Sequence, residues 1–239
     1  MILFTSYQDF IHRVEEIGFL PMSNILPGFP SLPAETPGHI WHTGLETDPW
    51  QWKDRAAEEK QLAYGCILGG HKGFVCARMY PIFYAAYHPV ALMPERWSAG
   101  TVNHLTWRLW HLFEEKCTLN TSQARKLLGV SAKKGGSQVD TGLKELQQDY
   151  YITVSGNMQK MSADGHLYGW PSNLYTRVAD WLPAYWKEKL SGWHRDEARE
   201  SILDTVVAIN KALDRQVVSR VLRLGYKDTF QFSSCATHS

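Results

Sequence analysis

The sequence has almost no net charge, few cysteines and no long apolar run. Its 239 residues include 25 Lys and Arg against 24 Asp and Glu. The hydrophobic content of 44% is that of an ordinary globular protein, which excludes a largely disordered chain. Apolar runs are only a few residues long, far short of the roughly 20 that a membrane-spanning helix needs. The N-terminus lacks the basic and apolar regions of a signal peptide. We therefore expect a soluble, cytoplasmic protein without a membrane partner.

Motifs for metal binding and catalysis are absent as well. The four cysteines are too scattered for a disulfide scaffold. Neither the pair His39 and His42 nor the trio Cys66, His71 and Cys76 has the spacing of a zinc site. The sequence contains no G-x-x-x-x-G-K-[ST], G-x-G-x-x-G, H-E-x-x-H or G-x-S-x-G motif. We therefore expect no cofactor and no metal, and no catalytic residue can be assigned.

Residues 1–100 are predicted to form an aromatic-rich N-terminal part that is helical in places and irregular in others. Apolar residues at helical spacing predict a first helix that Thr5 or Ser6 caps and that Gly18 ends. The stretch from 20 to 49 contains six prolines, which remove backbone donors and resist regular structure. The remaining expected elements are a helix over 50–64, a turn at Gly69-Gly70 and, over 79–87, either a strand or a buried helix.

Residues 101–178 have the element order of a winged helix-turn-helix. Apolar spacings of three and four predict a helix of about four turns beginning near Thr101. Next come a short helix that Thr121 caps and Gly129 ends, and a third helix that starts at Ser137. The apolar period then changes to two, which predicts a strand and a return strand over 166–170. Helices over 180–190, 196–213 and 215–224 form a C-terminal part, residues 179–239, and complete a mainly α fold with a small β component (α+β).

Basic residues are concentrated in the same window. Residues 116–160 contain seven basic and three acidic side chains, a surplus of four. Amides, hydroxyls and a lysine on the outer face of the third helix suit base edges and phosphates. We predict double-stranded DNA as the partner, with contacts from Arg125, Lys126, Lys133, Lys134, Ser137, Gln138, Thr141, Lys144 and Gln148. The alternative is a solvated helix face beside a basic loop, in a winged helix that binds protein.

A second candidate site lies among the aromatic residues of the N-terminal part. Trp50 and Trp52 flank Gln51 close to several tyrosines, and such rings can stack on a flat ligand such as a base. Asp54, Glu58 or Glu59 on the same predicted helix could supply a carboxylate to this pocket, and we assign Glu58 to it. The alternative is a core of packed rings, with Asp54, Glu58 and Glu59 as exposed charges on the helix.

Several segments resemble bacterial proteins described as AlkZ-related. The runs are TPGHIWHTGLETDPWQWKDRAAEEKQLAYG and GFVCARMYPIFYAAY, with DPWQWK (48–53) and AYG (63–65) as their most specific pieces. The stretch GSQVDTGLKELQQDYYI (136–152) fits the DNA-binding winged helix of that group. The resemblance covers residues 15–180 and implies distant kinship with winged-helix DNA glycosylases, which remove alkylated or crosslinked bases.

The catalytic motif of those glycosylases is not reproduced. They carry two polar catalytic residues in a Gln-x-Gln or Gln-x-Asp motif, whereas this sequence has no Gln-x-Gln and has Gln-x-Asp only at 138–140 and 147–149. Both triplets fall at the ends of the predicted third helix, outside the family's catalytic context. We therefore expect a non-enzymatic winged-helix DNA-binding protein such as a transcriptional regulator. The alternatives are a glycosylase-like DNA-repair hydrolase, or a degenerate relative of one, and a protein-interaction module.

Overall fold

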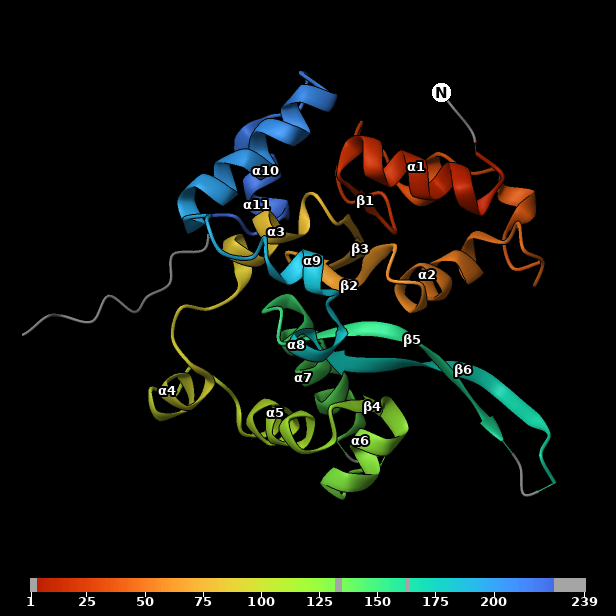
Figure 1. Cartoon of the computed structure of the whole chain (residues 1–239), viewed down its shortest axis with the longest axis vertical. Helices are drawn as coiled ribbons and strands as arrows, with labels where there is room; N and C mark the ends of the chain where they lie inside the picture. The colour runs from red at the N-terminus through yellow and green to blue at the C-terminus, as the bar shows by residue number, and fades with distance from the viewer. Residues whose placement is uncertain (1–3, 132–134, 162–163, 226–239) are drawn as a thin grey trace, which may run out of the picture.

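The computed structural model describes residues 4–131, 135–161 and 164–225. In these residues the chain is an α+β protein whose helices surround one six-stranded sheet (Figure 1). The strands lie in the order β1-β3-β2-β5-β6-β4, and every neighbouring pair is antiparallel. The β component is therefore larger than the sequence predicted. The strands are β1 (Phe19–Pro21), β2 (Leu62–Leu68), β3 (His71–Cys76), β4 (Thr118–Asn120), β5 (Ile152–Met161) and β6 (Leu167–Arg177).

The first helix forms as predicted. Helix α1 (Tyr7–Ile17) begins where the Ser6 hydroxyl accepts a hydrogen bond from the Asp9 amide, and it ends at Gly18, whose φ is 92°. Its buried face includes Phe10, whose ring stacks on Trp52 of helix α2 (Pro49–Glu58) at a centroid distance of 5.5 Å. This contact fixes α2 against the N-terminal half of the sheet. Between α1 and α2 the proline-rich stretch forms only β1 and the 3-10 turns η1 (Leu32–Ala34) and η2 (Gly38–Ile40).

The predicted helix over 50–64 is too long. Helix α2 stops at Glu58, Lys60 has a φ of 55°, and strand β2 begins at Leu62. A positive φ at a lysine is incompatible with a continuing α-helix, so the chain turns there. The turn at Gly69-Gly70 is confirmed between β2 and β3, and the aromatic run is helix α3 (Tyr80–Tyr87).

The middle of the chain forms three helices and a long hairpin. Helices α5 (His104–Lys116), α6 (Thr121–Leu128) and α7 (Gly136–Gln148) follow the predicted order, with the short strand β4 between the first two. Asn120, rather than Thr121, caps α6 by accepting a hydrogen bond from the Gln123 amide. The return strand is longer than the predicted 166–170, since β6 continues to Arg177. The hairpin β5–β6 projects beyond the helices (Figure 1).

A glycine allows α7 to approach α5 closely. A Cβ atom at Gly142 would lie 2.6 Å from Cδ1 of Leu109 and 3.1 Å from the hydroxyl oxygen of Thr106. Real Cβ atoms do not come so close to other atoms, so the absence of a side chain sets the distance between the two helices. The inner face of α7 also includes Val139, Leu143 and Leu146, which are all buried.

The sheet joins the N-terminal part to the hairpin. Tyr64 of β2 pairs with Val154 of β5, so one sheet continues across the predicted division at residue 100. The remaining helices are α4 (Met93–Ser98), α8 (Val178–Trp181), α9 (Ala184–Lys187), α10 (Arg195–Ile209) and α11 (Arg215–Val221). The helix predicted over 180–190 is instead split into α8 and α9, because Pro183 removes a backbone donor between them. Helices α10 and α11 lie beside α3 (Figure 1).

Candidate functional site

One face of α7 carries the polar side chains that the sequence predicted to meet DNA. Ser137, Gln138, Thr141 and Lys144 are all exposed. Positions 137, 141 and 144 are four and three residues apart, so they form one stripe along the helix. Lys126 on α6 is exposed as well. The structure therefore brings these residues together at the surface, and their contact with DNA remains a prediction.

Arg125 has a different environment from the other predicted contacts. Its Nη2 atom lies 2.8 Å and 2.7 Å from the two carboxylate oxygens of Asp140 on α7, and 3.5 Å from the carbonyl oxygen of Gly136. The guanidinium thus connects α6 to the first turns of α7. Because its charge is already paired, Arg125 is a poorer phosphate ligand than Lys126.

Three of the predicted DNA contacts are not part of this exposed helix face. Gln148 is only partly exposed, and its Oε1 accepts a hydrogen bond of 3.2 Å from Nη1 of Arg223. It therefore faces the C-terminal helices and not open solvent. Lys133 and Lys134 lie outside the described residues.

The predicted aromatic pocket is only partly assembled. Trp52 is 1% exposed and donates its indole N–H to the carbonyl of Glu46 at 2.7 Å, so it belongs to the core. Trp50 is exposed, with the Lys53 ammonium 4.8 Å from its ring centroid, a cation–π arrangement. Glu58 is exposed on the same helix. Trp50 and Glu58 therefore remain candidates for ligand contact, while the ring of Trp52 is not accessible.

A buried ion pair lies beneath these two residues, and sequence reasoning missed it. Lys53 Nζ and Asp54 Oδ2 are 2.5 Å apart, and both side chains are more than nine-tenths buried. Asn157 of β5 donates to the same carboxylate oxygen at 2.7 Å. The other oxygen, Oδ1, is buried and has no hydrogen-bond partner among the residues that the structure describes. The sequence suggested an exposed charge at position 54, and the structure corrects that expectation because α2 packs directly on β5.

The two Gln-x-Asp triplets have structural partners. In the first, Asp140 holds Arg125. In the second, Gln147 is buried, and its Oε1 accepts from the amide of Cys66 at 3.1 Å. Asp149 forms an ion pair of 2.8 Å with Arg96. Burial raises the pKa of Asp149, and the neighbouring Arg96 opposes that rise. Asp140, Gln147 and Asp149 therefore each have a structural partner.

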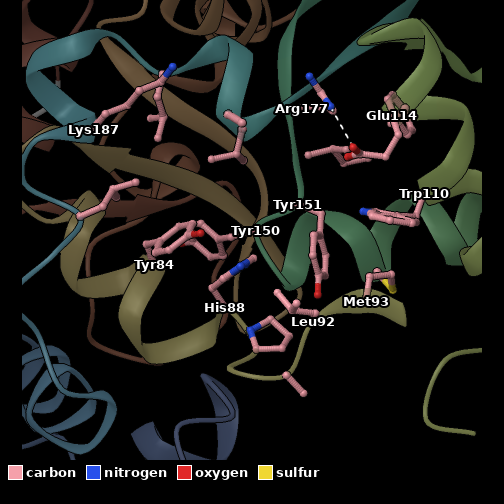
Figure 2. A pocket seen from close by; sticks show the side chains of 18 of the residues that line it. Tyr84, His88, Leu92, Met93, Trp110, Glu114, Tyr150, Tyr151, Arg177 and Lys187 are labelled. Carbon is pink, nitrogen blue, oxygen red and sulfur yellow. Dashed lines mark hydrogen bonds and ion pairs between the residues drawn. The ribbon is translucent and has the colours of Figure 1, made fainter. Parts of the chain in front are cut away.

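A mainly apolar pocket of about 610 Å³ lies between α3, α4, α5, α8 and the residues that connect α7 to β5 (Figure 2). Its aromatic wall includes Tyr84, Trp110, Tyr150 and Tyr151. His88 stacks on Tyr84 at 4.5 Å and donates its Nδ1–H to the Asp149 carbonyl at 2.8 Å. A pocket of this volume and composition has the size of small-molecule sites. No local sequence pattern indicates it, because the walls come from segments far apart in the chain.

The walls of this pocket also include charged and polar groups. Arg177 and Glu114 form an ion pair of 3.1 Å across one side, as the dashed line in Figure 2 shows. Burial lowers the pKa of His88, and the charges of Arg96 and Arg195 lower it further. The hydrogen bond to the Asp149 carbonyl opposes that shift. The imidazole is thus held as a neutral donor near pH 7.

The cysteines and histidines singled out in the sequence do not gather into a metal site. In the described part of the chain, no group of three or more His, Cys, Asp or Glu side chains is placed to hold a metal ion. Cys66 and Cys76 are buried free thiols, and burial raises the pKa of each. His71 contacts the carbonyl of Val221 at 3.2 Å.

These observations define the class of the protein. It is an α+β chain in which three helices precede a long hairpin, and the third helix has an exposed polar face. A family model described as AlkZ related matches residues 4–223, so the chain belongs to the AlkZ-related family. This finding confirms the resemblance inferred from the sequence motifs. Searches of curated proteins and of solved structures gave no match. In the described residues, no helix is long and apolar enough to cross a membrane.

Proposed function

We propose that this member of the AlkZ-related family binds duplex DNA and that residues 104–177 act as a winged helix. The order α5-β4-α6-α7-β5-β6 supports the proposal, with β4 pairing to the outer edge of the β5–β6 hairpin. The observation that carries it is the exposed polar stripe on α7, the third of the three helices. In this arrangement α7 is the recognition helix and the projecting hairpin is the wing.

In the proposed docking, one set of side chains contacts base edges and another contacts phosphates. The N-terminal half of α7 enters the major groove, where the Gln138 amide can form two hydrogen bonds with adenine and Thr141 can contact a base edge. Lys126 and Lys144, which flank this stretch, neutralise phosphates. A protein that reads sequence in this way without catalysis is suited to transcriptional regulation.

Charge removal and base-contact removal should affect binding differently. We expect the double variant K126Q/K144Q to weaken binding to all duplexes alike and to flatten the log–log salt slope by roughly two. Q138A should instead change the preference among sequences, by about 1–3 kcal/mol at one position, with little change in slope. Fluorescence anisotropy with a panel of labelled duplexes at several salt concentrations measures both effects.

A matched control uses two exposed lysines outside the proposed interface, Lys60 and Lys211. The variant K60Q/K211Q makes the same change in net charge and should bind DNA as the unmodified protein does. If it weakens binding as much as K126Q/K144Q, the attraction depends on overall charge and the α6–α7 interface is wrong.

A glycosylase-like repair activity is the second candidate, and the cluster around Asp54 favours it. Exposed Trp50 can stack on an extruded base, and the exposed Glu58 offers a carboxylate within the family-matching segment. Below them, Oδ1 of the buried Asp54 has no hydrogen-bond partner among the described residues. Incubating the same duplexes with an alkylated purine distinguishes the two candidates. Release of the base by the unmodified protein, abolished by E58Q together with W50A, would favour the repair function. Binding without release favours the regulator.

A further inference from the structure

Neither proposed function uses the apolar pocket of about 610 Å³ that Figure 2 shows. Three aromatic rings line it from separate segments: Tyr84 on α3, Trp110 on α5, and Tyr151 between α7 and β5. All three side chains are partly exposed, so a ligand can reach them. Aromatic walls favour a flat ligand, because rings pack on one another face to face or edge to face.

The rings of the pocket are held from behind by other side chains. Trp110 stacks on Trp107 at a centroid distance of 5.3 Å. The Tyr151 hydroxyl accepts a hydrogen bond of 3.4 Å from Nη1 of Arg96, and its ring meets His88 edge to face at 5.0 Å. The walls are therefore fixed before a ligand arrives, which lowers the entropic cost of binding.

The charged side chains of the pocket are already paired or solvated. Those that line it are Glu114, Arg177 and Lys187. Arg177 lies 3.1 Å from Glu114 and 2.6 Å from Asp180, so its charge is compensated. Lys187 is exposed, and water solvates its ammonium group. Because His88 is neutral near pH 7, no group in the walls requires a charge of opposite sign on the ligand.

One neutral donor is available to a ligand. Figure 2 shows the indole nitrogen of Trp110 pointing into the pocket, toward the side of Tyr151. Its N–H has no hydrogen-bond partner among the residues that the structure describes. A donor in mainly apolar surroundings gains most from an acceptor on the ligand, because little else there can pair with it.

We propose that this pocket binds a flat, uncharged molecule of fused aromatic rings whose carbonyl oxygen or ring nitrogen accepts a hydrogen bond from the Trp110 indole. The aromatic walls select the flat shape, and the indole N–H selects an acceptor on the ligand. The compensated charges of Arg177 and Glu114 disfavour a carboxylate or a phosphate ester, which would lose its hydration without gaining a free cation. The proposal does not depend on duplex binding.

The test compares two probes of the same shape, fluorenone and fluorene, in equilibrium dialysis against the full chain without DNA. Fluorenone carries a ketone oxygen, and fluorene has no acceptor. The unmodified protein should bind fluorenone. W110F keeps an aromatic ring and removes the donor, so it should weaken fluorenone binding by about three- to tenfold. Fluorene binding should change much less.

A second pair of variants tests whether the probe occupies this pocket. Ala91 lines it from the loop between α3 and α4, and A91W should weaken the binding of both probes by about tenfold or more, because the added indole fills the space. A99W makes the same change at an exposed residue that does not line the pocket, and it should bind both probes as the unmodified protein does.

Circular dichroism must first show that each variant is folded. No fluorenone binding by the folded, unmodified protein up to the solubility limit of the probe would overturn the proposal. Unchanged binding by A91W would also overturn it, because the probe would then lie elsewhere. Tighter binding of a fluorenone carboxylate than of fluorenone would show that Lys187 selects an anion, and equal weakening of both probes by W110F would contradict the indole hydrogen bond. Either result would make the proposed ligand class wrong.

Discussion

Replacing Asp54 with alanine is expected to lower the free energy of unfolding by about 3–5 kcal/mol. The substitution leaves the ammonium group of Lys53, a residue that is 6% exposed in the native protein, without its carboxylate partner. It also removes the acceptor of the Asn157 amide. An unpaired buried charge costs far more than the pair contributes, because neither water nor protein then solvates it. Urea unfolding followed by tryptophan fluorescence measures the loss.

A double substitution separates the unpaired charge from the lost contact. In K53M/D54L neither charge of the buried pair remains, so the free energy of unfolding should fall by only about 1 kcal/mol, mainly because Asn157 loses an acceptor. A single K53M change should resemble D54A, since it leaves the carboxylate alone. If D54A is as stable as the unmodified protein, Lys53 has reached solvent and the pair is not a structural one.

Replacing Gly142 with valine is expected to push α7 away from α5. The added Cβ alone would lie 2.6 Å from Leu109 Cδ1 and 3.1 Å from Thr106 Oγ1, and the two methyl groups increase the overlap. Overpacking of this kind costs about 1–3 kcal/mol. Because the position of α7 on α5 sets the direction of its polar stripe, G142V should also weaken duplex DNA binding.

The control for this prediction is a valine at an exposed position of the same helix. Q138V places a β-branched residue at an exposed position of α7, where only helix propensity changes, so its cost should stay below about 0.7 kcal/mol. Urea unfolding compares the two variants. Equal stability of G142V and the unmodified protein would contradict the close helix packing.

The helices were largely predictable, because their signals are local. Ser6 and Gly18 mark the ends of α1 within a few residues of sequence, and Gly129, with a φ of 70°, ends α6 as expected. The sheet was not predictable in the same way. Pairing of Tyr64 with Val154 joins residues 90 positions apart, and no local period encodes such a contact. Strand β2 is buried throughout, so it lacks the alternation that identifies a half-buried strand.

The same difference between local signals and long-range contacts applies to the candidate site. Exposure of Ser137, Gln138 and Thr141 follows from helical spacing, so the polar face of α7 could be predicted. The pairing of Arg125 with Asp140 could not, because it depends on how α6 packs against α7. Likewise, charged residues on a helix are usually exposed, and only the packing of α2 on β5 makes Asp54 an exception.

The salt dependence of duplex binding by the unmodified protein tests the central proposal most directly. Lys126 and Lys144 flank the recognition stretch of α7, and the sequence adds Lys133 and Lys134 between α6 and α7. Three or four neutralised phosphates would release counterions at about 0.9 per phosphate, which predicts a log–log slope of roughly −3 to −4 in fluorescence anisotropy. Failure to bind any duplex at low salt, by protein that circular dichroism shows to be folded, would contradict the account and favour a protein-interaction role for the same helices.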